Sequence, residues 1–273
     1  MKRRDLPTAK SRLRKREIAF AVAAGLVAAT GAAVVLEGMH DDNQQVAIAT
    51  EDAGRAIEAN RAYQVEPFQD VAIIGPQDVV VTYGDAFSVR AEGPADTLTK
   101  LKVKSEGGKL TIGPGGNFNR FDWDSSAPVT FYLTLPHIEE IVQAGSGDVT
   151  IDKVEGSRFK GTIAGTGELQ VGTMNVDRAV LTVAGSGTLS ASGKARNTDV
   201  SIGGAGSVQA RDLKSEDASI RIAGAGDVDM YVADEAKIAI FGSGDVDITG
   251  TTKCSVTKIG AGDVQCNGEQ VAD

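Results

Sequence analysis

Apolar and polar residues alternate through the second half of the chain, around a glycine turn that recurs seven times. The turn has the pattern Gly-[Ser/Thr/Ala]-Gly-x-[Val/Leu], and successive first glycines lie 18 to 20 residues apart. Apolar residues recur two and four positions before the first glycine, and four and six positions after it. This period of two predicts two short strands per repeat, each with one buried face, joined by the turn. The glycine pairs are Gly145 and Gly147, Gly165 and Gly167, Gly185 and Gly187, Gly204 and Gly206, Gly224 and Gly226, Gly242 and Gly244, and Gly260 and Gly262.

The repeat length predicts how these strands assemble. A repeat of about 18–20 residues without a helical stretch predicts that corresponding strands stack in parallel, as the coils of a β-helix. The two polar exceptions at the apolar position before the turn, Gln143 and Lys258, fall in the first and last copies, where coils are expected to be atypical. A phosphate-binding or dinucleotide-binding glycine loop would open a helix, whereas a strand follows these turns. We therefore interpret the glycines as structural, because a sharp corner needs positive φ or room for the neighbouring coil.

The segment before the regular repeats follows the same pattern less faithfully. Residues 63–140 are predicted to form degenerate N-terminal coils, and residues 75–79 within them look like a faded copy of the turn. A polar-aromatic insertion at 117–127 interrupts this segment, and the regular repeats occupy 141–273. The predicted fold class is therefore all-β, a parallel β-helix built from both segments.

The first 62 residues differ in composition from the rest. Residues 1–17 form a basic tail, and residues 18–36 form a 19-residue run without a charge. The length of that run predicts a transmembrane helix, and its flanking charges orient the N-terminus toward the cytoplasm. The alternative is a cleaved signal peptide, whose apolar region usually spans about 7–15 residues. Residues 37–62 are interpreted as a polar spacer, and with either alternative the body of the protein is exported.

Charge is divided sharply along the chain. The tail carries eight Lys or Arg against two acidic residues, and the remainder has a net charge of −15. An acidic body repels nucleic acid and anionic lipid, so the basic tail is not interpreted as a DNA-binding arm. The predicted partners are instead the membrane, through the 18–36 helix, and a glycan or an envelope protein.

Several segments together resemble a known bacterial family. They are "F-x-x-V" at 68–71, "LKVKSEGGKLTIG" at 101–113, "VTFYLTLPHIEEI" at 129–141 and the repeated GSGDV and GAGDV turns. Over roughly residues 65–268 the chain resembles the putative auto-transporter adhesin, head GIN domain family. The resemblance implies a right-handed β-helix without established catalytic residues. Members of the family often follow a signal peptide or a lipoprotein signal, but no lipobox cysteine follows the apolar run of this chain. The apolar run itself predicts a domain in the periplasm, anchored in the inner membrane, or one that is secreted or periplasmic after signal cleavage.

The two cysteines lie in the last repeat. Cys254 and Cys266 stand six positions before and six positions after Gly260, both at inward offsets. In an exported protein they could form a disulfide, which typically contributes about 2–4 kcal/mol. The alternative is two buried thiols that behave as small apolar residues.

Acidic residues follow several of the turns on an outward-facing column. If the coils stack, these side chains lie about 4.8 Å apart, so a cluster near the C-terminal end could hold calcium through oxygen ligands. The alternative is that each aspartate accepts backbone N–H bonds at its turn while solvent screens its charge. No other cofactor is predicted. The candidate metal ligands are Asp227, Asp229, Asp245, Asp247 and Asp263.

Motifs for catalysis are absent from the sequence. It contains no His-x-x-x-His, Cys-x-x-Cys or Gly-x-Ser-x-Gly, so neither a zinc site nor a serine-hydrolase elbow is supported, and no catalytic or cofactor-binding residue is predicted. The predicted function is a non-enzymatic envelope module for binding or adhesion. One alternative is a structural protein whose coils associate end to end, with the oligomeric state open. The other is a polysaccharide-processing enzyme that uses the insertion, where Arg120, Asp122, Trp123 and Asp124 lie.

Overall fold

The computed structural model describes residues 33–35, 44–50, 58–115 and 128–271. The chain divides into two units, Met1–Gly31 and Ala32–Asp273, and every described residue lies in the second. The described part contains nineteen strands and a single short helix. The predicted all-β class is therefore confirmed.

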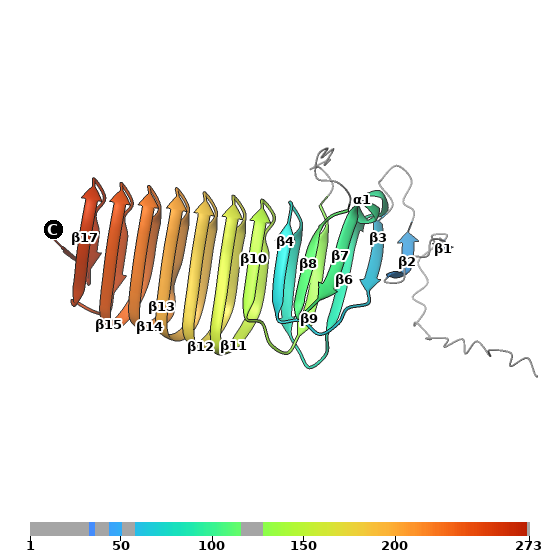
Figure 1. Cartoon of the computed structure of the whole chain (residues 1–273), viewed down its shortest axis with the longest axis horizontal. Helices are drawn as coiled ribbons and strands as arrows, with labels where there is room; N and C mark the ends of the chain where they lie inside the picture. Colours follow the sequence, from blue (N-terminus) through green and yellow to red (C-terminus); the bar gives the residue numbers. More distant parts are fainter. Residues whose placement is uncertain (1–32, 36–43, 51–57, 116–127, 272–273) are drawn as a thin grey trace, which may run out of the picture. The chain divides into compact units, whose positions relative to one another are not determined.

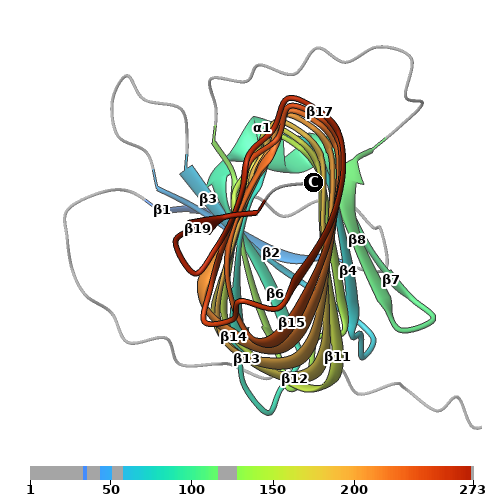
Figure 2. The ribbon, with the colours of Figure 1, turned by 90° about the vertical axis from the view of Figure 1, so that its left-hand side faces the viewer.

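Long strands that each run from one glycine turn to the next form the regular coils (Figure 1). Each pairs in parallel with the following strand over most of its length, with Gly145 beside Gly165, Gly165 beside Gly185 and so on along the stack. Viewed from the C-terminal end, the coils overlay one another (Figure 2). The predicted β-solenoid is thus confirmed. Its strands are β10 (Glu140–Gly145), β11 (Val149–Gly165), β12 (Glu168–Gly185), β13 (Thr188–Gly204), β14 (Ser207–Gly224) and β15 (Asp227–Gly242).

The core of the coils is made of the apolar positions that flank each turn. Leu181, Val183 and Leu189 are fully buried, and their counterparts in neighbouring coils are buried in the same way. In-register stacking places Val183 between Ile163 and Ile202, and Leu189 between Leu169 and Val208. Removing apolar surface from water contributes roughly 25 cal/mol per Å², so the same small set of residues stabilises every coil.

The C-terminal end consists of shorter strands. β16 and β17 both pair in parallel with β15, β18 pairs in parallel with β16, and β19 pairs antiparallel with β18. The end coil is therefore split into separate pieces, and a short hairpin covers one of them. These strands are β16 (Val246–Thr249), β17 (Cys254–Gly260), β18 (Val264–Cys266) and β19 (Glu269–Gln270).

The coil beside β10 and β11 comes from a distant part of the sequence. β4 (Asp70–Ile74) pairs in parallel with β10, and β5 (Asp78–Tyr83) pairs in parallel with β11, so the faded turn lies on the first regular turn. On their other side, β4 and β5 pair in parallel with β8 (Lys109–Pro114) and β9 (Thr130–Leu135). The coil that comes first in the chain therefore lies between two coils that come later.

The remaining N-terminal strands are antiparallel to their neighbours. β6 pairs with β9, β3 with β6, β2 with β3, β1 with β2, and β7 with β8. The parallel stack is thus continued by an antiparallel sheet, which includes part of the predicted spacer. These elements are β1 (Ala33–Val35), β2 (Gln44–Thr50), β3 (Glu58–Tyr63), β6 (Ser88–Pro94), β7 (Leu101–Glu106) and the helix α1 (Ala95–Lys100).

The predicted transmembrane helix over residues 18–36 is wrong. Residues 33–35 of that run form β1, which pairs antiparallel with Ile48–Thr50 of β2. The β-branched Val34 and Val35 favour a strand, and a strand partner is present. Among the described residues α1, with six residues, is the only helix, and none is long and apolar enough to cross a membrane. Residues 18–32 and Leu36 lie outside the described residues, as do 1–17.

Candidate binding groove

The predicted turn glycines stack on one another at one edge of the coils (Figure 1). Gly224 has φ of +139°, in the region that side chains with a Cβ rarely adopt. Gly226 has no such φ, but a Cβ there would lie 2.5 Å from both the Gly206 carbonyl oxygen and the Ile202 Cγ2 atom. The first glycine of each turn thus serves both backbone conformation and close stacking of coils, and the second serves close stacking alone.

The acidic residues after the turns bond to the next coil rather than to their own turn. The Asp245 carboxylate accepts the backbone N–H of Asp263 at 2.8 Å, and the Asp227 carboxylate accepts that of Asp245 at 3.3 Å. The Asp263 carboxylate accepts the Gln270 side-chain amide at 3.0 Å. The same bond joins the Asp148 carboxylate to the N–H of Glu168 at 2.9 Å. Three of these four bonds therefore form a ladder between coils, and each of the three satisfies a backbone donor that the turn leaves open.

The other two predicted metal ligands are held by an arginine. Arg211 donates from Nε to Asp229 at 2.7 Å and from a terminal nitrogen to Asp247 at 2.8 Å. Hydrogen bonding to Asp229 is the main reason that the pKa of Arg211 is raised above its ordinary value. Among the residues the structure describes, no three His, Cys, Asp or Glu side chains form a group that could hold a metal ion. The five aspartates are brought onto one face but do not converge.

A groove of about 760 Å³ crosses the strand segments that follow the turns of β12 to β15. Ser190 in β13 lies in register between Gln170 of β12 and Gln209 of β14. Gly172 and Ser192 continue the row of short side chains, so the longer neighbours rise on either side of a hollow. Side-chain length thus varies along this outward column, and the strand register also shifts beside it, after Val171, after Ser190 and after Ala210.

The lining of the groove is rich in hydrogen-bonding groups. Its outward side chains are hydroxyls, amides, three carboxylates and one guanidinium, and no described lining residue is a histidine or a cysteine. The Thr188 and Ser207 hydroxyls lie 3.2 Å apart at one side, and the Ser192 hydroxyl bonds to the Gly172 carbonyl. Such a surface presents paired donors and acceptors to a ligand that carries many hydroxyls.

Neither the groove nor Arg211 is among the sequence predictions. The sequence contains a signal for both when the seven repeats are compared position by position from the first glycine of each turn. At the fifth position after the first glycine the residues run Gln170, Ser190, Gln209, with the short one in the middle. Arg211 stands seven positions after Gly204, two coils from Asp247. Reading each outward column for side-chain length and charge, in addition to burial, would reveal them.

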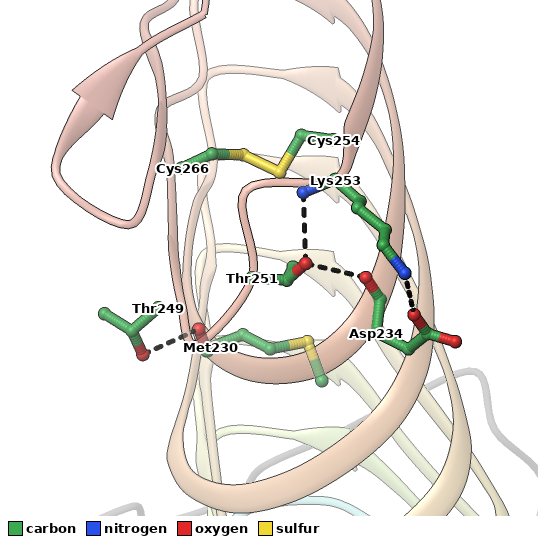
Figure 3. Close-up of a disulfide and its surroundings, with 7 residues drawn as sticks. All are labelled: Met230, Asp234, Thr249, Thr251, Lys253, Cys254 and Cys266. Atoms are coloured by element: carbon green, nitrogen blue, oxygen red, sulfur yellow. Dashed lines mark hydrogen bonds and ion pairs between the residues drawn. A yellow bond between two sulfur atoms is a disulfide. The ribbon is translucent and has the colours of Figure 1, made fainter.

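The structure joins Cys254 and Cys266 by a disulfide in the last coil (Figure 3). Their Cα atoms lie 6.6 Å apart, within the range that a disulfide spans. Beside them Thr251 is buried. Its hydroxyl donates to the Asp234 carbonyl at 2.6 Å and accepts the backbone N–H of Lys253 at 3.0 Å. Lys253 in turn bonds to the Asp234 carboxylate at 2.5 Å. The disulfide thus joins β17 to β18 within the end coil, and the small polar network around Asp234 fastens that coil to β15.

The predicted enzymatic platform falls on the insertion at 117–127. Arg120, Asp122, Trp123 and Asp124 lie outside the described residues.

A protein-family model described as putative auto-transporter adhesin, head GIN domain, matches residues 67–252. This span contains the degenerate N-terminal coil and all of the groove. Among curated proteins no relative matches the chain.

Several solved structures share the fold. A putative adhesin from Bacteroides fragilis NCTC 9343 has a TM-score of 0.68 at 19% identity, covering 77% of this chain and 96% of that one. A putative lipid binding protein from Parabacteroides distasonis ATCC 8503 has a TM-score of 0.62 at 18% identity, with 77% and 96% covered. A putative adhesin from Parabacteroides merdae ATCC 43184 has a TM-score of 0.61 at 17% identity, with 78% and 97% covered. At these identities the likeness establishes the shared fold.

Proposed function

The chain belongs to the putative auto-transporter adhesin, head GIN domain family, and from that membership we propose that it is a non-enzymatic binding module whose groove holds an uncharged, hydroxyl-rich glycan. The observation that carries this proposal is the hollow at Ser190, flanked in register by Gln170 and Gln209. A volume of about 760 Å³ lies within the usual range for small-molecule sites, roughly 300–1,000 Å³.

The charge of the groove favours a neutral ligand over an anionic one. Asp212, Asp227 and Asp229 line it together with a single basic residue, Arg211. Because Arg211 already bonds to Asp229 and Asp247, it has little capacity left to hold an external anion. A ligand rich in hydroxyls can instead bond to the serine and amide side chains without introducing a like charge.

The outward lining also favours a glycan over an acyl chain. The solved protein from Parabacteroides distasonis is described as a lipid binding protein, but here the side chains that face the groove outward are hydroxyl, amide and charged groups. Burying those groups against hydrocarbon would leave their hydrogen bonds unmade. A location at the cell envelope or outside the cell accords with the family, and an adhesin that meets glycans needs such a location.

A glycan array probed with the full chain tests this proposal. We expect retention on neutral oligosaccharides and its loss, by at least about tenfold, in Ser190→Gln, which fills the hollow with the side chain already present on both sides. Thr150→Gln is the matched control, because Thr150 occupies the same exposed column in β11 but does not line the groove. Equal retention of the wild type and Ser190→Gln, or retention on no neutral glycan, would overturn the proposal.

End-to-end association is a second candidate function that one observation favours. β17 pairs with β15 on one side, and no described strand takes a register on its other side. Ile259 in β17 is 66% exposed, and Phe241 beside it in β15 is 54% exposed. An open strand edge with apolar neighbours is a template for pairing with another chain. Sedimentation velocity of the full chain over a range of concentrations tests it, and a monomer throughout would reject it.

A further inference from the structure

Arginines gather on a different face of the coils, formed by the strand segments that precede the turns. Arg158 of β11 and Arg178 of β12 lie in register in adjacent coils. Together with Arg221 of β14 they line a pocket of about 490 Å³, in which Val180 and Asp199 are the other lining residues. The pocket thus runs obliquely across four coils, with Arg158 in the first and Arg221 in the last.

The positive charge of this pocket is only partly compensated. Arg178 bonds to the Asp199 carboxylate, from Nε at 2.9 Å and from a terminal nitrogen at 2.6 Å. The side chains of Arg158 and Arg221 make no hydrogen bond or ion pair with any residue that the structure describes. Two guanidinium groups therefore remain available, each with a planar set of donors that matches carboxylate and sulfate oxygens.

The cluster lies on a protein that is acidic as a whole. The protein as a whole has a net charge of −9, and other exposed basic residues such as Arg211 and Lys253 are bonded to carboxylates. Like charges directly opposite on neighbouring strands destabilise a sheet, yet Arg158 lies beside Arg178. An anionic ligand across the two would remove that repulsion.

From these observations we infer that the pocket is a second binding site, separate from the groove, and that it takes a strand of carboxylated or sulfated polysaccharide. With coils about 4.8 Å apart and a rise of about 3.3 Å per residue, Arg158 and Arg221 are separated by roughly 20 Å along the backbone surface. One small anion cannot contact guanidinium groups at both ends of such a row, whereas a chain with repeated acidic groups can.

Hydroxyl side chains extend the site in the direction that a polysaccharide needs. Thr182 and Ser201 lie in register with one another and with Arg221, on the same outward column. Val180 is half-buried and offers a small apolar floor between the arginines. Sugar hydroxyls and ring faces therefore have partners between the charged groups, which a lipid headgroup or inorganic phosphate would leave unused.

Binding of polygalacturonate, dextran sulfate, neutral dextran and inorganic phosphate to the full chain, measured by calorimetry, tests this inference. We expect both polyanions to bind, and binding to weaken with added salt because the contacts are exposed. Arg158→Gln with Arg221→Gln should weaken binding by about tenfold or more. Arg196→Gln is the matched control, since Arg196 is also exposed but does not line the pocket and is near Asp177 and Glu216.

The outcomes separate this site from the groove. Ser190→Gln should leave polyanion binding unchanged, so a failure of the groove proposal does not affect this one. The inference is overturned if the double variant, shown by thermal melting to remain folded, binds the polyanions as the wild type does. It is equally overturned if neither polyanion binds at low salt, if neutral dextran binds as well as they do, or if inorganic phosphate alone binds with the same affinity.

Discussion

The regular coils and the N-terminal coils use the same parallel pairing but differ in the order in which the chain supplies them. From β10 to β15 each coil lies on the one that follows it in sequence, so Gly165 meets Gly185. In the N-terminal part Val71 lies beside Ile141, 70 residues further along the chain. Closing a longer loop costs more entropy, but only slowly with length. The stacking surface, rather than chain order, therefore selects the neighbour of a coil.

The two ends of the stack are also closed differently. At the N-terminal end antiparallel strands continue the sheet beyond β8 and β9. At the C-terminal end the disulfide between Cys254 and Cys266 and the short β18–β19 hairpin hold the last coil. Because each coil of a solenoid contacts mainly its neighbours, damage at one end should spread little to the other.

Replacing a turn glycine in a regular coil should have the largest effect on the free energy of unfolding. Gly224→Ala should lower the free energy of unfolding by about 4 kcal/mol, because positive φ is strained for alanine and its Cβ would overlap the Gly204 carbonyl oxygen. Gly107→Ala is the control in the N-terminal part. Its φ is +59° but its Cβ would meet nothing, so the cost should be only about 1 kcal/mol. Urea denaturation of both variants measures this difference, and equal costs would show that close stacking of turns contributes nothing.

Loss of the disulfide should have the next largest effect and should be local. Replacing Cys254 and Cys266 together by serine should cost about 3 kcal/mol, because the bond closes a short loop that the unfolded chain would otherwise leave free. Hydrogen–deuterium exchange should become faster in β16 to β19 and stay unchanged in β3 to β9. Faster exchange throughout the chain would contradict the view that the two ends are stabilised separately.

The hydrogen bond that joins the N-terminal coils to the regular coils should contribute as much to the free energy of unfolding as an equivalent bond within the regular coils. The Asp78 carboxylate accepts the N–H of Asp148 at 2.9 Å, as the Asp245 carboxylate accepts that of Asp263 at 2.8 Å. Asp78→Ala and Asp245→Ala should each cost about 1 kcal/mol, since one exposed, charge-assisted hydrogen bond is lost. Asparagine at either position retains a hydrogen-bond acceptor and should restore most of the lost stability. Thermal melts that show no cost for Asp78→Ala would mean that the junction lacks this ladder.

The smallest expected effect concerns pH at the same junction. Burial, together with the charges of Glu140 and Glu139, raises the pKa of the Asp70 carboxyl. A raised pKa in the folded state means that stability falls as the pH rises from the unfolded value, about 3.9, through the folded one. Asp70→Asn should therefore stabilise the protein at pH 7 by about 0.5 kcal/mol or less, and not at all near pH 3. Destabilisation at pH 7 would show instead that attraction to Lys109 or Lys160 outweighs the burial of the Asp70 carboxylate and its repulsion by the two glutamates.

Local features of the fold could be predicted from the sequence, but its long-range pairing could not. The glycine spacing and the period-two alternation around Gly165 indicate the coils, because each coil carries its own turn and core residues. The turn at Gly75 was recognisable for the same reason, and the structure places it on Gly145. Nothing local says that β4 lies between β8 and β10, since all three present similar apolar faces.

The candidate sites were less predictable than the fold. The aspartates after the turns were visible as a column, but the donors that they bind are backbone groups of the next coil, which no side-chain pattern reveals. Arg211 and the hollow at Ser190 depend on differences between neighbouring coils, so they emerge only when each outward column is compared across the stack. The transmembrane prediction for 18–36 rests on the length of the uncharged run and on its flanking charges, and neither shows that residues 33–35 pair with β2.

Hydrogen–deuterium exchange of the full chain with and without a neutral oligosaccharide tests most directly the claim that the regular coils carry the binding groove. We expect slower exchange on ligand addition in the segments that line the groove, around 170–172, 190–192 and 207–212, and no change in the N-terminal strands. Protection that appears in β3 to β9 instead, or that is unchanged by Ser190→Gln, would contradict it.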